Sequence, residues 1–200
     1  MRALVTTGHG SLDVLQVREW PDPVVGPGQI GIDVHAAGLT FADVIARKGL
    51  YRDAPKPPAV MGYEVAGVVN ALGEGAEGFA VGDPVLAGTR FGGQAERVAT
   101  AAANAVPIPA GFSFEQAAAV PVNYTTAWAA LVRYGNVQPE DRVLVHAAAG
   151  GVGIAALQIA RRAGAEIYGT ASPAKHEAVR AHGADVAVDY TRAGWWKELP

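Results

Sequence analysis

The alternation of apolar and polar residues predicts that the first part of the chain is built from short strands. Residues 29–37 alternate and place Ile30, Ile32 and Val34 on one face, as in a half-buried strand. Turns rich in glycine and proline separate this segment from its neighbours. Further strands are predicted at residues 2–6, 12–19, 63–71, 84–87, 93–99 and 105–108. Many short strands of this kind indicate a small β-barrel.

The second part of the chain shows a pattern that is typical of a dinucleotide-binding fold. Residues 143–145 are an apolar run that includes β-branched residues, as in a buried parallel strand, and after Val152 the apolar positions recur with helical spacing. Two more strands are predicted at residues 166–169 and 186–188, with a helix at 173–182 between them. This order of strands and helices predicts a parallel sheet with right-handed crossovers.

Helical segments lie between the two parts. A helix over residues 113–119 has Ser113 as its N-cap, and another helix is predicted over residues 126–134. The β-rich pattern has ended by this point, so the domain boundary is expected near residue 123. The predicted domains are residues 1–123 and 124–200.

Composition and charge exclude several classes of protein. Half of the 200 residues are hydrophobic, which allows a sizeable core, and the net charge of −3 provides no basic field for nucleic acid. The chain has no cysteine, which excludes a disulfide scaffold, a thiolate nucleophile and a cysteine-ligated metal. We expect no signal peptide and no membrane span, because the most apolar stretch, residues 143–160, contains His146, Gln158 and three glycines. The expected location is the cytoplasm.

The turn between the strand at 143–145 and the following helix is a candidate phosphate-binding site. It reads Ala148-Ala-Gly-Gly-Val-Gly153, whereas the usual fingerprint is G-x-G-x-x-G. Gly150 would let the backbone approach a pyrophosphate, and Gly153 would let the helix pack on the strand. The N–H groups of the first helical turn would hold the phosphate charge. The candidate residues are Ala149, Gly150, Gly151, Val152 and Gly153. A tight turn without a ligand is the alternative interpretation.

The residues after the second strand of this fold favour NADPH over NADH. An NAD-binding fold places Asp or Glu about 20 residues after the glycine turn, where it binds the ribose 2′-OH. Here that count reaches Thr170, and Ser172 and Lys175 follow it. A hydroxyl and a positive charge suit a 2′-phosphate. Alternatively, Ser172 caps the helix that begins at Pro173, and Lys175 is a solvated surface lysine.

Several motifs in one order carry a resemblance that covers the whole chain. They are Gly38-Leu-Thr-Phe-Ala-Asp43, Arg47-x-Gly49-Leu-Tyr51, Gly62-Tyr-Glu-Val-Ala-Gly67, Gly82-Asp-x-Val85, Pro121-Val-Asn-Tyr-Thr-Thr-Ala127 and the Ala-Gly-Gly-Val-Gly turn. With them the chain resembles the medium-chain dehydrogenase/reductase superfamily, in its zinc-free quinone oxidoreductase (zeta-crystallin) branch, and looks VAT-1-like. The resemblance implies an α/β protein in which a GroES-like β-barrel domain precedes a truncated Rossmann dinucleotide-binding domain.

The resemblance also implies an activity and further site residues. The implied reaction is hydride transfer from NADPH to a small-molecule quinone or enone without a metal. Tyr51 is the candidate hydrogen-bond donor to the oxygen on which charge develops, and Thr40 and Tyr63 match positions at the substrate side. Thr126 matches a position that contacts the nicotinamide carboxamide, and Tyr190 matches one that approaches the 2′-phosphate. A homodimer is expected as well.

Three departures from the family pattern change what is expected. Tyr63 stands where the zinc enzymes of the superfamily have a metal-binding histidine, and Thr40 stands where the quinone oxidoreductase branch has asparagine. Family members are also considerably longer, so we expect these residues to be the front part of a longer polypeptide. The five histidines show no metal-ligand spacing, and we expect surface or strand positions for His9, His35, His146, His176 and His182.

Alternatives remain open for the function and for individual residues. The protein could be an enoyl-thioester reductase, or a VAT-1-like nucleotide-binding protein without turnover. Tyr51 and Tyr63 could be ordinary packing aromatics, and Thr126 could be a helix cap. Asp43, Glu64 and Asp83 are expected to be structural residues that bind backbone N–H groups.

Overall fold

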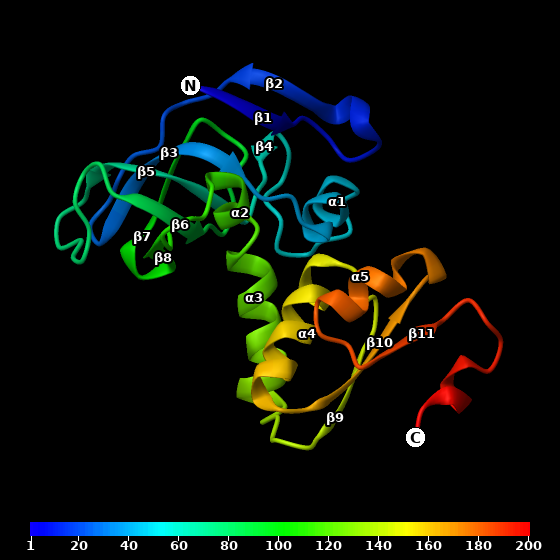
Figure 1. The fold of residues 1–200 in the computed structure, drawn as a ribbon. Helices are drawn as coiled ribbons and strands as arrows, with labels where there is room; N and C mark the ends of the chain where they lie inside the picture. The colour runs from blue at the N-terminus through cyan, green and yellow to red at the C-terminus, as the bar shows by residue number, and fades with distance from the viewer. The chain divides into compact units, whose positions relative to one another are not determined.

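The computed structural model, which describes residues 1–200 except for the side chain of residue 198, contains two compact units. The first unit is Met1–Val122 and the second unit is Asn123–Pro200. In Figure 1 the first unit runs from blue to green and the second from green to red. Each unit encloses buried side chains of its own.

The first unit is built from two antiparallel sheets. The larger sheet has the strand order β7-β3-β5-β6-β8 and the smaller one the order β2-β1-β4. A bridge between Ala3 and Ala95 connects them, and Leu4 N–H donates to the Gln94 carbonyl oxygen at 2.9 Å. The strands are β1 (Arg2–Thr6), β2 (Leu15–Glu19), β3 (Gln29–Ala37), β4 (Ala59–Val60), β5 (Glu64–Leu72), β6 (Pro84–Gly88), β7 (Arg97–Ala101) and β8 (Ala105–Pro107).

The alternation in the sequence correctly identified the core of this unit. Ile30 and Ile32 of β3 are fully buried, and they pack with Val65 and Val69 of β5 and Val85 of β6. The pattern therefore predicts which face of each strand points inward, because successive side chains of a strand alternate between its two faces.

Two strand predictions need correction. The segment predicted at 12–19 begins with a 3₁₀ turn at Leu12–Val14, and only Leu15–Glu19 pairs as β2. The strand predicted at 93–99 begins at Arg97, because Gly93 and Gln94 donate instead to the carbonyl oxygens of Gly62 and Met61.

The first unit also contains short helices. Helix α1 (Phe41–Arg47) follows β3, and helix α2 (Phe114–Ala118) packs against β3 and β5. The predicted N-cap at Ser113 is confirmed, since its hydroxyl accepts a hydrogen bond from the Gln116 N–H at 3.3 Å. The Gln116 side chain accepts in return from the Ser113 N–H at 2.9 Å, which completes a capping box.

Helix α3 (Pro121–Trp128) begins five residues before the predicted start at residue 126 and continues as a π-helical turn, Ala129–Tyr134. Proline suits the first position of a helix, because the N–H that it lacks would have no intrahelical partner there. The sequence Pro121-Val-Asn-Tyr is therefore the first turn of the helix. The boundary between the units falls in this turn, after Val122.

The second unit is a three-stranded parallel sheet of order β11-β10-β9. Its strands are β9 (Arg142–Val145), β10 (Glu166–Ala171) and β11 (Val186–Asp189). Helix α4 (Gly151–Ala163) connects β9 to β10, and a 3₁₀ turn (Pro173–Lys175) followed by α5 (His176–Ala181) connects β10 to β11 (Figure 1). Both helices pack against β10. The predicted strand–helix order is confirmed.

Candidate functional site

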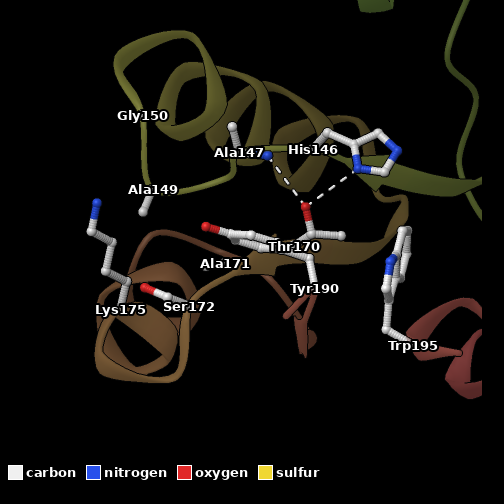
Figure 2. Close-up of a pocket in the computed structure, with 10 residues that line it drawn as sticks. All are labelled: His146, Ala147, Ala149, Gly150, Thr170, Ala171, Ser172, Lys175, Tyr190 and Trp195. Atoms are coloured by element: carbon white, nitrogen blue, oxygen red, sulfur yellow. Dashed lines mark hydrogen bonds between the residues drawn. The ribbon is translucent and has the colours of Figure 1, made fainter. Parts of the chain in front are cut away.

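A pocket lies at the carboxyl ends of the parallel strands of the second unit, where open α/β sheets bind their ligands. Its volume is about 540 Å³. In Figure 2 Ser172 and Lys175 lie on one side of the pocket, and His146 and Trp195 lie on the other. None of the ten lining residues is Asp or Glu. They are His146, Ala147, Ala149, Gly150, Thr170, Ala171, Ser172, Lys175, Tyr190 and Trp195.

The turn between β9 and α4 is held in a sparsely populated conformation. Ala147 has φ of 50°, in the left-handed region that residues with a side chain rarely adopt. Hydrogen bonds to Thr170 fix this turn on β10: Ala148 N–H donates to the Thr170 carbonyl oxygen at 3.0 Å, and Ala147 N–H donates to its hydroxyl at 3.3 Å. Strained backbone held by several contacts is frequent at ligand-binding sites.

Close contacts surround two glycines of this turn, and those of Gly153 are with backbone atoms. A Cβ at residue 153 would lie 2.5 Å from the Ala147 carbonyl oxygen, and a Cβ at residue 151 would lie 2.6 Å from the Asn123 amide oxygen. A close approach at Gly153 is found, but it is to the backbone of the turn at Ala147 and Ala148, which follows the strand. Gly150 is the N-cap of α4, and the first N–H groups of an α-helix have no intrahelical partner and are available to an anion.

Ser172, Lys175 and Tyr190, which the sequence analysis named as candidate cofactor residues, line the same pocket. Ser172 stands before the 3₁₀ turn, but its hydroxyl makes no capping hydrogen bond, so the capping alternative is wrong for the side chain. Only its backbone serves the turn, where the Ser172 carbonyl oxygen accepts from Lys175 N–H at 2.9 Å. The Ser172 hydroxyl and the Lys175 ammonium group therefore form one polar end of the pocket.

The sequence analysis did not predict the residues that form the other end of the pocket. His146 was expected at the surface or within a strand, and it is exposed directly after β9, but its place in the lining of the pocket was not predicted. Its Nδ1 lies 3.3 Å from the Thr170 hydroxyl, and its ring stands edge-on to Trp195 with centroids 5.6 Å apart. The position of His146 at a strand's carboxyl end was a usable signal, whereas nothing in the sequence placed Trp195.

Three predicted cofactor residues of α4 and one of α3 do not line this pocket. Gly151, Val152 and Gly153 form the first turn of α4, next to the lining residue Gly150. Thr126 is exposed in the second turn of α3. Because the helix begins at Pro121, the alternative that Thr126 caps it is wrong.

In the first unit, Tyr51, Tyr63 and Phe91 form an aromatic cluster. The Tyr51 and Tyr63 ring centroids are 6.0 Å apart in an edge-on arrangement, and those of Tyr63 and Phe91 are 5.2 Å apart. The Tyr63 hydroxyl is buried and has no hydrogen-bond partner among the described residues. Burial above all, and then Tyr51, Asp43 and Asp53, raises the pKa of Tyr63 to about 12.

Thr40 lies outside the aromatic cluster and is connected to it through Asp43. The Asp43 carboxylate accepts hydrogen bonds from the Thr40 N–H at 2.8 Å and from its hydroxyl at 2.9 Å. Its other oxygen accepts from Gly62 N–H, beside Tyr63, at 3.0 Å. The structural role expected for Asp43 is confirmed.

The two other carboxylates that were expected to be structural also bind backbone N–H groups. Glu64 is buried and accepts from Val122 N–H at 2.8 Å, and burial raises the pKa of its carboxyl group. Asp83 accepts from Ala80 N–H at 2.7 Å in the turn before β6. Both predictions are confirmed.

The metal and membrane expectations can be compared with what the structure describes. Within the described residues, no three His, Cys, Asp or Glu side chains are grouped so that they could hold a metal ion. No helix in the described part of the chain is long and apolar enough to cross a membrane.

Comparisons with known proteins agree with this architecture. A family model described as the alcohol dehydrogenase GroES-like domain matches residues 26–128. The human synaptic vesicle membrane protein VAT-1 homolog is 43% identical over 202 residues, which cover all of this chain and 51% of that protein. The chain thus spans about half the length of this relative.

Solved structures of two enzymes are similar to the whole chain. Escherichia coli quinone oxidoreductase complexed with NADPH has a TM-score of 0.91 at 31% identity, covering 100% of this chain and 61% of that chain. The CurK enoyl reductase has a TM-score of 0.92 at 33% identity, covering 99% and 62%.

Proposed function

Since the chain belongs to the medium-chain dehydrogenase/reductase superfamily, in its quinone oxidoreductase and VAT-1-like branch, we propose that it serves NADPH-dependent reduction of quinones or enone-type double bonds without a metal. One observation carries the proposal. Ser172, Lys175 and Tyr190 gather beside the glycine turn, in a pocket where none of the lining residues that the structure describes carries a carboxylate.

The residues of the pocket fit NADPH. The backbone of the turn leaves no room for a side chain at residue 153, and the first N–H groups of α4 would hold the pyrophosphate. Lys175 would supply the positive charge for the 2′-phosphate, and Ser172 and Tyr190 would donate hydrogen bonds to it. When bound, NADPH supplies the hydride of the reaction. Thr126 is proposed to contact the nicotinamide carboxamide, as the family resemblance implies.

The first unit would supply the groups that face the substrate. Reduction of a quinone or enone places negative charge on an acceptor oxygen, which a nearby hydrogen-bond donor stabilises. Tyr51 is the proposed donor, because its side chain is 37% exposed and its phenol can also release a proton. Thr40 orients Asp43 and thereby the backbone before Tyr63.

Enoyl-thioester reduction is a second candidate, favoured by the similarity to the CurK enoyl reductase. Both reactions add hydride to a conjugated double bond, so the same cofactor pocket serves either. A comparison of the turnover rate with 9,10-phenanthrenequinone and the turnover rate with an acyl-thioester enone separates the two candidate reactions. NADPH binding without oxidation by either acceptor would support a nucleotide-binding protein without turnover.

The choice between NADPH and NADH gives the first test of the proposed function. Lys175→Ala removes the only ammonium group that lines the pocket, and a hydrogen bond to a charged group contributes about 1.5–3 kcal/mol. We expect the dissociation constant for NADPH to rise by about 10- to 100-fold and that for NADH to stay unchanged. Titration of cofactor fluorescence measures both constants.

The matched control is Lys48→Ala, which removes an exposed lysine of the first unit and should change neither constant. Equal affinity of the parent protein for NADPH and NADH would contradict the assignment. A Lys175→Ala protein that binds both cofactors more weakly by the same factor would contradict it as well.

A further inference from the structure

The Tyr63 hydroxyl is an unsatisfied polar group inside the first unit. Among the side chains that the structure describes, Thr6 and Tyr63 have a buried oxygen without a hydrogen-bond partner. Leaving such a group unpaired costs about 1–3 kcal/mol. A phenylalanine at residue 63 would keep the ring contacts and avoid this cost. Packing alone therefore does not explain why residue 63 carries a hydroxyl group.

The backbone around Tyr63 is held by several hydrogen bonds. Gly62 N–H donates to Asp43 at 3.0 Å, and the Gly62 carbonyl oxygen accepts from the Thr89 hydroxyl at 2.9 Å. The Tyr63 carbonyl oxygen accepts from Thr89 N–H at 2.7 Å. Gly62 itself has φ of 101°, and a Cβ there would lie 2.6 Å from the Gln94 nitrogen. The position of Tyr63 is therefore fixed in advance.

The two aromatic neighbours of the Tyr63 ring differ in solvent exposure and in the chain segment from which they come. Phe91 packs against the ring at 5.2 Å and is partly buried. Tyr51 stands edge-on at 6.0 Å, is 37% exposed, and follows α1 at the start of a loop. Tyr51 is thus the neighbour that can move away and admit an acceptor atom to the Tyr63 hydroxyl.

We propose that Tyr63 and Tyr51 form a two-donor site for a single carbonyl oxygen of a quinone or enone substrate. This inference rests on the proposed function and deepens it. Two hydrogen bonds to one oxygen stabilise developing negative charge, and Tyr63, whose backbone is held in advance, is the donor that needs no reorganisation during the reaction. The unpaired hydroxyl of Tyr63 obtains its missing partner when the substrate binds.

The two tyrosines have different tasks in this site. With a pKa of about 12, raised mainly by burial, Tyr63 stays protonated near neutral pH. It therefore donates a hydrogen bond and keeps its proton. Tyr51 lies at the surface, where solvent can replace any proton that its phenol releases. Tyr63 is accordingly the permanent donor of the pair.

The test is Tyr63→Phe in the intact chain, because this change removes only the hydroxyl. We expect the turnover rate with 9,10-phenanthrenequinone to fall by about 100-fold, as for loss of one oxyanion donor. The dissociation constant for NADPH should stay unchanged. The melting temperature should not fall and should rise by a few degrees, because an unsatisfied group is removed.

A binding measurement makes the test independent of turnover. Binding of 9,10-phenanthrenequinone, followed by quenching of tryptophan fluorescence, should weaken by about 10-fold in Tyr63→Phe. Tyr134→Phe is the matched control, because that side chain is 78% exposed and outside the cluster, and the change should alter no readout. Tyr51→Phe should also lower the turnover rate with little change in NADPH affinity.

The outcomes separate this inference from the proposed function. If the parent protein reduces the quinone and Tyr63→Phe does so equally well, the two-donor site is overturned and the proposed function stands. If the parent protein reduces no acceptor, the proposed function fails. In that case the affinity for the quinone tests the role of the Tyr63 hydroxyl. Weaker quinone binding in Tyr63→Phe supports the donor role, and equal binding overturns it. A marked loss of stability in Tyr63→Phe would show a structural role for the hydroxyl.

Discussion

Gly153 shows how one absent side chain shapes the nucleotide turn. Its place at the end of the glycine pattern predicted that the helix packs closely on the strand, and the structure shows the close contact with the turn that follows the strand. A Cβ there would lie 2.5 Å from the Ala147 carbonyl oxygen and 2.8 Å from the Ala148 backbone. These neighbours are backbone atoms of a strained turn, so they cannot yield as a flexible side chain would.

Gly153→Ala should therefore destabilise the protein and weaken cofactor binding. Overpacking of this kind costs about 1–3 kcal/mol, and any shift of α4 also displaces the N–H groups of its first turn. Thermal unfolding and NADPH titration measure the two effects. Gly88→Ala is the matched control, because a Cβ at residue 88 meets no atom within 4 Å. Unchanged NADPH affinity in Gly153→Ala would contradict the role given to the turn.

Other residues of the site could not be predicted, because their environment is created by segments distant in the sequence. His146 meets Trp195, which follows β11, and Tyr63 meets Phe91, which follows β6. The missing partner of the Tyr63 hydroxyl is likewise a property of the packed unit. Ser172 and Lys175 could be predicted, since local spacing from the glycine turn places them.

At the level of elements, alternation and turn residues determined most of the predicted boundaries. Strands β1 and β3 agree with the sequence pattern, because turns that contain glycine bound each segment. Strand β4 has two residues, which is too short for any periodicity to be seen. Helix α3 was predicted to start at residue 126, which is too late, because Pro121 was not recognised as the first residue of the helix.

Thr170 connects two elements of the cofactor pocket, and its hydroxyl can be tested. The buried hydroxyl at the end of β10 accepts from the Ala147 N–H and contacts His146 Nδ1 (Figure 2). Thr170→Val keeps the shape of the side chain and leaves that N–H without its acceptor, at a cost of about 1–3 kcal/mol. We expect a lower melting temperature and an NADPH dissociation constant raised by about 10-fold.

Thr170→Ser is the conservative control, because it keeps the acceptor oxygen and should restore both values to near those of the parent protein. If Thr170→Val binds NADPH as tightly as Thr170→Ser, the hydroxyl does not position the turn. If both variants lose affinity equally, the loss cannot be assigned to the hydroxyl, because Thr170→Ser keeps the hydroxyl and Thr170→Val keeps a methyl group.

At the scale of the whole molecule, the predicted fold class is confirmed by the family model and by the similar solved structures. Several short motifs in one order carried that prediction, and each would have been weak alone. Cofactor specificity, the homodimer and the cytoplasmic location stay predictions. The activity of the whole protein stays a proposal too, since the chain spans about half the length of the human VAT-1 homolog.

The absence of a metal site is the prediction that draws on the whole chain. Zinc in proteins needs three or four N, S or O ligands from side chains brought together by the fold. The chain has no cysteine, its five histidines are dispersed, and Tyr63 occupies the middle of the Gly-x-Glu motif. We expect elemental analysis to find far less than one zinc per chain. Incubation with a chelator should change neither the melting temperature nor NADPH binding, because metal bound to the folded state would otherwise contribute to its stability. Stoichiometric zinc, or a melting temperature lowered by the chelator, would show that oxygen and nitrogen ligands form a site which the sequence pattern does not reveal.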